Sequence, residues 1–309
     1  MLKLHGIYAP IATPFLNDEI SYHHLAENMK FWLSSKLSGI VVMGSNGEFV
    51  VLNTHEKKEL IKAVCELGQG KKPIIAGTGC ESTKETIELT NYAAEVGANA
   101  ALILSPNYYK KAMTDELIKN FYREVADASS IPIILYNMPG NSGINLSAKL
   151  IAELSTHSNI IGVKDSGGNI SQISEVIAAV SDEFAVFAGS ASFLYPGLAL
   201  GATGGTLALA NILPDECATM LEFVELGKHK EARDIQLKLL EINQAVTARW
   251  GVAGLKAAMD MLGLYGGPPR KPMQPLASAE RKVLEDILVK AKNSVKEILL
   301  DSTEELKCL

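Results

Sequence analysis

The residue of this chain best suited to act as a nucleophile is a lysine at the end of a short apolar run. The run 160–163 leads into Lys164, and a glycine-rich turn at 166–168 follows. An apolar run of this length before a glycine turn predicts a buried strand. Burial disfavours the charged form of an amine, and a neutral amine can attack a carbonyl and form a Schiff base. The alternative is a lysine that reaches solvent or pairs with Asp165.

A tyrosine and a second glycine-rich turn could complete such a site. Tyr136 ends the apolar run 131–136, where its phenol could pass protons. The turn Gly44–Glu48 contains Ser45 and Asn46, and N–H groups of such a turn at a helix N-terminus can hold a carboxylate. These groups together predict a site that forms an imine with a 2-oxo acid. Further polar residues fall in or after predicted strands: Tyr108, Tyr109, Asn141, Ser166, Ser190 and Thr206.

Each feature also has a simpler interpretation when it is taken alone. Tyr136 could be a core tyrosine bonded to a backbone carbonyl, and Gly44–Glu48 could be only a tight turn. The pair Tyr108 and Tyr109 could pack at the rim of a barrel. Their common position at predicted strand ends favours a functional site.

Apolar and amphipathic runs alternate along the first part of the chain, at a spacing of about one strand–helix unit. This alternation predicts parallel strands joined by helices. Eight units favour a (β/α)8 TIM barrel over a doubly wound sheet, which usually has about five or six strands. The predicted strands are 6–11, 39–43, 73–77, 100–104, 131–136, the run ending at Lys164, 185–188 and 204–208. Helices are predicted at 22–34, from 53, and at 83–95, 115–128, from 147, 170–180 and 193–200.

The strand pattern stops near residue 215, and the remaining sequence is helical in character. Helices are predicted at 215–226, 229–247, 254–262 and 279–299. We therefore expect a barrel domain at 1–226 and a C-terminal helical extension at 227–309. In a barrel of this kind the active site lies at the C-terminal ends of the strands.

Composition excludes several other classes of function. The chain has 309 residues, 47% of them hydrophobic, and a formal net charge of -6, and it contains no block of Lys and Arg. Nucleic acid is therefore not an expected partner. The 4 cysteines and 6 histidines show no CxxC or HExxH spacing, so no metal site is expected. Free thiols and the absence of a secretory pattern are typical of a cytoplasmic protein.

Two segments resemble features of other protein classes. The stretch 184–214 has no charged residue, but Pro196 and several glycines divide it, so we expect buried strands and not a membrane span. The segment 77–82 begins like a dinucleotide fingerprint and lacks the third glycine. A nicotinamide-dependent oxidoreductase is therefore one rival hypothesis. A barrel that binds a 2-oxo acid as a sensor is another.

These residues give the chain a resemblance to a known family. The segments 44–48, 135–139 and 162–166 are similar to those of the dihydrodipicolinate synthase and N-acetylneuraminate lyase family of class I aldolases, and the similarity extends over essentially the whole chain. The resemblance implies a (β/α)8 barrel with a helical extension and a pyruvate Schiff base on Lys164, without a metal or other cofactor. It also implies a homotetramer built as a dimer of dimers, in which Tyr108 or Tyr109 reaches the site of a neighbouring subunit.

The positions that bear on the substrate depart from two branches of that family. Synthases of the family usually carry Thr-Thr in place of Ser45-Asn46, and an arginine that holds the carboxylate of the aldehyde in place of Asn141. N-acetylneuraminate lyases tend to have an acidic residue where the segment 189–192 is neutral. Both departures argue against those activities.

The chain more closely resembles the 4-hydroxy-2-oxoglutarate aldolase branch, in the segments 44–49, 79–83, 164–168, 188–191, 254–256 and 265–268. This resemblance implies cleavage of a 4-hydroxy-2-oxo acid to pyruvate and an aldehyde, which is glyoxylate for 4-hydroxy-2-oxoglutarate. The alternatives are the synthase reaction, which condenses pyruvate with aspartate semialdehyde, and an aldolase acting on a 2-keto-3-deoxy sugar acid or on an N-acetylneuraminate-type substrate.

The resemblance assigns a role to each candidate residue. Lys164 attacks the C2 carbonyl, and the iminium accepts electrons as the C3–C4 bond breaks. Tyr136 passes the proton of the C4 hydroxyl, helped by Ser45 and Tyr108. Ser45 and Asn46 hold the carboxylate of the pyruvyl group. The candidates for the distal end of the substrate are Asn141, Ser166, Ser190 and Thr206.

Overall fold

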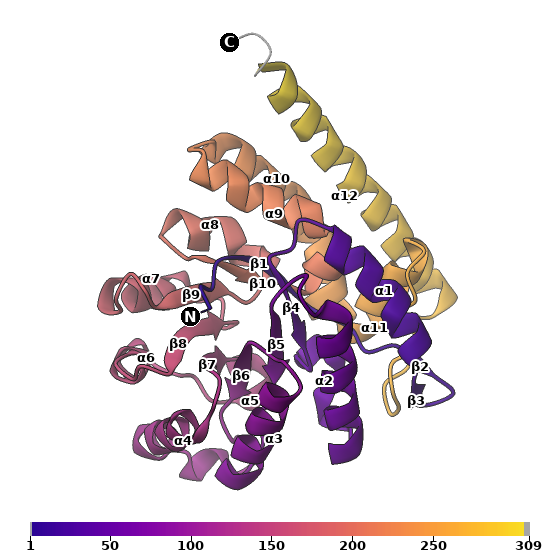
Figure 1. Cartoon of the computed structure of the whole chain (residues 1–309). Coiled ribbons are helices and arrows are strands. Elements are labelled where there is room, and N and C mark those ends of the chain that lie inside the picture. The colour runs from indigo at the N-terminus through magenta and orange to yellow at the C-terminus, as the bar shows by residue number, and fades with distance from the viewer. Residues whose placement is uncertain (1, 306–309) are drawn as a thin grey trace.

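The protein is described by a computed structural model that covers residues 2–305, with side chains described up to residue 299 (Figure 1). Within these residues, eight parallel strands close into a barrel in the order β1-β10-β9-β8-β7-β6-β5-β4. The expected (β/α)8 fold is thus confirmed. The barrel strands are β1 (Gly6–Pro10), β4 (Gly39–Val42), β5 (Ile74–Gly77), β6 (Ala100–Leu104), β7 (Ile133–Asn137), β8 (Ile160–Asp165), β9 (Ala185–Ala188) and β10 (Gly204–Thr206).

Helices surround the barrel, as the amphipathic runs predicted (Figure 1). Helix α2 shows how local sequence sets one boundary, because Asn53 and Glu56 form a reciprocal capping box. The Glu56 N–H donates to Asn53 Oδ1 at 3.0 Å, and the Asn53 N–H donates to Glu56 Oε2 at 2.9 Å. The helices are α1 (Tyr22–Ser34), α2 (Thr54–Gly68), α3 (Thr83–Glu95), α4 (Asp115–Ala128), α5 (Pro139–Ser142), α6 (Ala148–Ser155), α7 (Ile170–Ala179), α8 (Leu194–Ala199) and α9 (Pro214–Glu225).

Both faces of the barrel strands are buried, which explains why the strands read as continuous apolar runs. One set of side chains packs outward against the helices. The other set fills the barrel, and its members include Tyr8 and Phe187, whose ring centroids lie 5.4 Å apart. Because successive side chains alternate between the faces, Tyr136 belongs to the inner set with Ile134.

The chain after the barrel forms further helices: α10 (His229–Gln244), a π-helical turn (Ala245–Arg249), α11 (Gly251–Met261) and α12 (Ser278–Glu305). Helix α12 packs along α10 and runs out beyond the barrel toward the C-terminus (Figure 1). The boundary expected at residue 226 falls in the turn between α9 and α10. No helix within the described part of the chain is long and apolar enough to cross a membrane.

Several short elements differ from the sequence expectations. Strand β7 begins at Ile133 and not at residue 131, because Pro132 has no N–H to donate to the sheet. Strand β10 ends at Thr206, and Ala208 enters a 3-10 turn (Ala208–Asn211). The Asn211 side chain holds that turn by donating to the Ala208 carbonyl at 3.0 Å. The hairpin β2 (Phe15–Leu16) and β3 (Glu19–Ile20) and helix α5 were not predicted.

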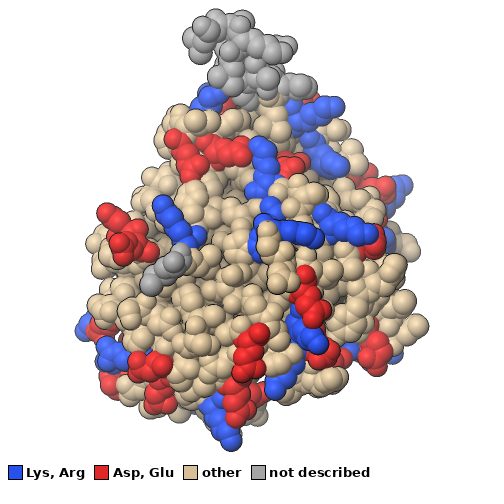
Figure 2. All heavy atoms as spheres, in the orientation of Figure 1, with Lys and Arg blue, Asp and Glu red and all other residues tan. Residues whose placement is uncertain are grey.

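Charged side chains of both signs are interspersed on the face of the molecule shown in Figure 2. They form no large patch of a single sign on that face. This distribution agrees with the mild net charge of -6 in the sequence.

Candidate active site

Lys164 and Tyr136 lie opposite each other in the pairing of β8 with β7, near the C-terminal ends of both strands. Lys164 Nζ lies 4.2 Å from the centroid of the Tyr136 ring. The side chains are nearly inaccessible, with exposed fractions of 4% for Lys164 and 5% for Tyr136. The structure therefore places a buried amine and a phenol together at the end of a TIM barrel where active sites are built.

Asp165 does not pair with Lys164, because neighbouring residues of a strand point to opposite faces. Its carboxylate accepts hydrogen bonds from Asn137 Nδ2 at 2.7 Å and from Gln172 Nε2 at 3.2 Å. It also accepts from the Gly167 N–H at 2.8 Å. Within the described residues Lys164 forms no ion pair, so the alternative of a lysine paired with Asp165 is wrong.

The Tyr136 hydroxyl lies 3.1 Å from Ser45 Oγ, at hydrogen-bond distance. Burial raises the pKa of Tyr136, but the positive charge of Lys164 and hydrogen bonds from Ser45, Lys164 and Ser166 outweigh it. The pKa of Tyr136 therefore lies below its ordinary value. A phenol with a lowered pKa, beside an amine, is suited to accept and return a proton.

The turn that carries Ser45 and Asn46 follows β4 as a 3-10 turn (Ser45–Gly47). The helix expected from residue 53 is confirmed, because α2 begins at Thr54 with Asn53 as its N-cap, so the turn does not lie directly at that helix N-terminus. A second 3-10 turn (Phe49–Val51) lies between the first turn and α2, because Glu48 adopts a left-handed conformation with φ of 58°. Thr13 Oγ1 donates to the Gly47 carbonyl at 2.7 Å and fixes the turn to the chain after β1. Asn46 is half-buried in the turn.

The residues expected at the distal end of the substrate lie on different loops around the barrel end. Ser166 lies near enough to Tyr136 for its hydroxyl to help lower the pKa of the phenol. Thr206 is buried and pairs in register with Tyr8, an inward-facing residue. Asn141 is exposed in α5 and, with Ser45, lines a hollow of about 330 Å³ between the loops after β4, β5, β6 and β7.

Ser190 lies in the loop after β9, which helix α10 holds in place. Asn243 Nδ2 donates to Ser192 Oγ at 2.7 Å and to Ser190 Oγ at 3.3 Å. Gln236 Nε2, on the same helix, donates to the Ala191 carbonyl at 2.7 Å. The helical extension thus shapes this side of the site, a role that the sequence did not reveal.

Tyr108 and Tyr109 are exposed on the loop after β6, with exposed fractions of 76% and 72%. Their rings pack edge to face with centroids 5.1 Å apart. Within residues 2–305 the Tyr108 hydroxyl makes no hydrogen bond to Ser45 or Tyr136. A role for either tyrosine in the site of a neighbouring subunit stays a prediction.

The segment 77–82 has a structural reason for its second glycine. A Cβ on Gly79 would lie 2.6 Å from the Leu104 carbonyl oxygen, so the close approach to β6 requires glycine. The Glu81 carboxylate accepts from the N–H groups of Asn107 and Tyr108, at 3.0 and 2.9 Å. Packing and loop bonding therefore account for this segment without a dinucleotide. In addition, no group of three or more His, Cys, Asp or Glu within the described residues could hold a metal ion.

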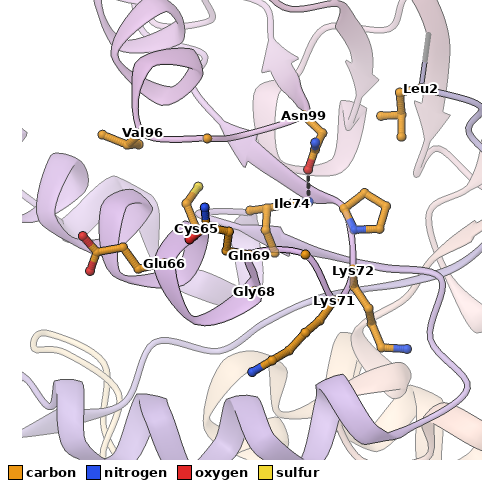
Figure 3. Close-up of a pocket in the computed structure, with 13 residues that line it drawn as sticks. Leu2, Cys65, Glu66, Gly68, Gln69, Lys71, Lys72, Ile74, Val96 and Asn99 are labelled. Atoms are coloured by element: carbon orange, nitrogen blue, oxygen red, sulfur yellow. Dashed lines mark hydrogen bonds between the residues drawn. The ribbon is translucent and has the colours of Figure 1, made fainter.

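Another hollow, of about 530 Å³, lies at the opposite end of the barrel between the ends of α2 and α3 (Figure 3). Its polar groups already serve the fold. Asn99 Oδ1 accepts from the Ile74 N–H at 2.8 Å, and Lys72 Nζ donates to the Ser35 carbonyl at 2.8 Å. Burial raises the pKa of the Cys65 thiol to about 11, so the thiolate is scarce. This hollow is not a candidate for the chemistry.

Comparison with known proteins agrees with this geometry. A family model described as the dihydrodipicolinate synthetase family matches residues 3–291. The chain belongs to the dihydrodipicolinate synthetase family. The 4-hydroxy-tetrahydrodipicolinate synthase of Geotalea uraniireducens is 37% identical over 283 residues, covering 92% of this chain and 97% of that protein.

Solved structures of this family are also similar to the chain. The 4-hydroxy-tetrahydrodipicolinate synthase of Methylacidiphilum fumariolicum has a TM-score of 0.91 at 28% identity, covering 96% of this chain and 98% of its own. A chloride-inhibited dihydrodipicolinate synthase from Acinetobacter baumannii, solved with pyruvate, has a TM-score of 0.89 at 30% identity, covering 93% and 99%. The chain is therefore an enzyme, a carbon–carbon lyase of the class I aldolase type.

Proposed function

We propose that Lys164 forms a Schiff base with pyruvate and that the enzyme makes or breaks a carbon–carbon bond at C3 of that adduct. The observation that carries the proposal is the contact of Lys164 with Tyr136, whose hydroxyl in turn meets Ser45. These three groups supply a nucleophile, a proton carrier and a hydroxyl partner within one cluster at the end of the barrel. The family and the pyruvate bound to the Acinetobacter enzyme support the same chemistry.

The Lys164 amine attacks C2 of pyruvate, water leaves, and an iminium forms. Tyr136 then takes a C3 proton, and the iminium accepts the electron pair of that C–H bond, which gives an enamine. In the condensing direction, C3 of the enamine attacks the aldehyde carbon, and Tyr136 gives a proton to the new alkoxide. In the cleaving direction, Tyr136 removes that proton and the C3–C4 bond breaks. The Ser45–Gly47 turn holds the pyruvyl carboxylate, and no metal or other cofactor takes part.

Aspartate semialdehyde is the first candidate for the aldehyde. Relatives named 4-hydroxy-tetrahydrodipicolinate synthase, at 37% and 35% identity over 92% of this chain, favour this synthase reaction over the cleavage that the sequence suggested. The aldehyde carries a carboxylate and an ammonium group. Polar residues around the barrel end, including Ser166, Ser190 and Thr206, are candidates to bind its distal end.

Cleavage of a 4-hydroxy-2-oxo acid, such as 4-hydroxy-2-oxoglutarate, is the second candidate. One observation keeps it open, because it argues against the synthase reaction: Asn141, at the position where synthases of the family usually have a carboxylate-binding arginine, is a neutral side chain at the hollow beside Ser45. An amide offers a carboxylate neither charge nor the paired donors of a guanidinium.

The Schiff base is tested by incubating the enzyme with pyruvate, reducing with borohydride and mapping the adduct by peptide mass. We expect a reduced pyruvyl adduct on Lys164 and none in Lys164→Arg. An adduct elsewhere, or none, contradicts the mechanism. An adduct on Lys164 with no turnover of any aldehyde would instead support a 2-oxo-acid sensor.

The two substrates are separated by a panel. Initial rates are compared for pyruvate with aspartate semialdehyde, and for cleavage of 4-hydroxy-2-oxoglutarate, measured by released pyruvate. The larger kcat/KM identifies the reaction. A homotetramer, expected from the family, is tested separately by sedimentation.

A further inference from the structure

A second buried lysine lies outside the catalytic cluster. Lys256 on α11 pairs with Glu48, the residue that ends the turn carrying Ser45. Lys256 Nζ and Glu48 Oε1 are 2.5 Å apart, and both side chains are 1% exposed. The contact is an ion pair between two buried side chains.

Three further contacts enclose this ion pair, which we call the Glu48–Lys256 pair. The Arg270 N–H donates to the second carboxylate oxygen, Glu48 Oε2, at 2.8 Å. Lys256 Nζ donates to the Pro268 carbonyl at 3.0 Å and lies 4.4 Å from the centroid of the Phe15 ring. Helix α11 and the loop between α11 and α12 therefore hold Glu48 from two sides.

Arg270 fixes this arrangement to α2 as well. Its guanidinium forms a bidentate salt bridge with the Glu56 carboxylate. Nη1 donates to Oε2 at 2.9 Å, and Nη2 donates to Oε1 at 2.6 Å. The same guanidinium lies over the Phe15 ring, with Arg270 Cζ 4.5 Å from the ring centroid. A bidentate contact of a planar guanidinium is directional, so it fixes the position of the loop at residue 270. It thereby also fixes the backbone N–H of Arg270, which binds Glu48.

Stability alone does not explain a buried ion pair. Burial lowers the pKa of Lys256, while the Glu48 carboxylate and Asp260 oppose this change. Taking both charges out of water costs free energy, and well-packed apolar side chains in such places often stabilise a protein as much or more. The Glu48–Lys256 pair is therefore better explained by what it positions.

What it positions is the turn beside the reacting groups. Glu48 has a left-handed φ of 58°, a conformation that side chains other than glycine adopt at a cost. In this conformation its N–H donates to the Ser45 carbonyl at 3.1 Å. Ser45 Oγ then lies 3.1 Å from the Tyr136 hydroxyl. A continuous series of contacts thus joins Lys256 to the catalytic tyrosine.

We propose that Lys256 is a positioning residue, which through Glu48 holds the Ser45–Gly47 turn in the geometry that binds the carboxylate of the oxo acid and meets Tyr136. The binding role rests on the proposed function, and the link to Tyr136 does not. Lys256 touches neither substrate nor Lys164. Its loss moves the turn and weakens binding of pyruvate more than it slows the chemical step at saturation.

The test compares Lys256→Met and the isosteric Glu48→Gln with a control, Lys290→Met. Lys290 on α12 pairs with Glu241 on α10 at 2.8 Å, on the exposed surface of the helical extension. For each variant, KM and kcat are measured with pyruvate, along with the pyruvate concentration that half-saturates borohydride trapping. The ultraviolet titration of Tyr136 is taken as the difference between each variant and the same variant carrying Tyr136→Phe.

We expect KM and the half-saturating concentration to rise about ten- to a hundredfold in both variants, with a smaller fall in kcat. The Tyr136 titration moves to higher pH in both, because the Ser45 hydrogen bond is weakened. The control stays at wild-type values. Folded variants with unchanged pyruvate binding and an unchanged Tyr136 titration would overturn the proposal. If Lys256→Met does not fold, Glu48→Gln decides by the same measurements.

A failure of the proposed function has a different signature. In that case the wild-type enzyme gives no adduct with pyruvate at Lys164. The Tyr136 titration needs no substrate, so it still tests whether the Glu48–Lys256 pair positions Ser45.

Discussion

Lys164 and Tyr136 are cross-strand neighbours, with the lysine Nζ 4.2 Å from the centre of the tyrosine ring. The contact brings a positive charge to a phenol that burial would otherwise keep protonated. It also means that an imine at Lys164 forms directly beside the group that has to move a proton. The register of two strands is therefore what joins nucleophile and proton carrier.

Tyr136→Phe removes the proton carrier and leaves the ring beside Lys164. We expect kcat to fall about 10²- to 10⁴-fold, the usual contribution of a positioned acid–base group. The adduct with pyruvate still forms, so borohydride trapping at Lys164 persists, although more slowly. Tyr92→Phe, at a half-buried helical position, is the matched control. Loss of trapping together with turnover would contradict the separation of the two roles.

Ser45→Ala tests the hydrogen bond that helps to lower the pKa of Tyr136. The Ser45 hydroxyl lies 3.1 Å from the phenol and favours the phenolate, so its removal raises the pKa of Tyr136. The apparent pKa of the alkaline limb in the pH profile of kcat then rises. The ultraviolet titration of Tyr136, isolated by subtracting the Tyr136→Phe variant, should move in the same direction. A shift to lower pH, or none, would show that Ser45 does not tune the phenol.

Asp165→Ala removes the acceptor of three hydrogen bonds at the end of β8. The carboxylate is 2% exposed and receives bonds from Asn137, Gln172 and the Gly167 N–H. We expect the free energy of unfolding to fall by about 3 kcal/mol, because the buried Asn137 amide and two part-buried donors lose a charged partner. Denaturant unfolding measures the change. Asp182→Ala, at an exposed position, should stay within about 0.5 kcal/mol of wild type. Equal losses in the two variants would contradict the assignment.

The barrel could be predicted from sequence because parallel strands buried on both faces leave a plain signal of repeated apolar runs. The same pattern places Lys164 and Tyr136, since each ends such a run and C-terminal strand ends meet at one side of a barrel. Alternation along a strand also fixes the opposite direction of Asp165, an inference that was available before the structure.

Contacts between distant segments could not be predicted in this way. Lys256 stands in an apolar helical run, which marks it as buried but does not identify Glu48 as its partner. The amide groups of Gln236 and Asn243 are ordinary polar residues on an amphipathic helix until the fold brings them to the loop after β9. Helix α5 has only the residues Pro139–Ser142, too few to show a period. The role predicted for Tyr108 in a neighbouring subunit concerns a second chain, so the fold of one chain does not test it.

The choice of aldehyde is tested at Asn141, the exposed residue of α5 at the hollow beside Ser45. Asn141→Arg places a guanidinium there, which binds a carboxylate through two parallel hydrogen bonds. We expect the ratio of kcat/KM for aspartate semialdehyde over butanal, each with pyruvate, to rise about tenfold, equivalent to about 1.4 kcal/mol. KM for pyruvate should be unchanged, because the turn that holds it is untouched. Asn141→Gln, which stays neutral, is the control. An unchanged ratio in Asn141→Arg would show that the distal carboxylate binds elsewhere, and Ser190 and Thr206 would become the positions to vary.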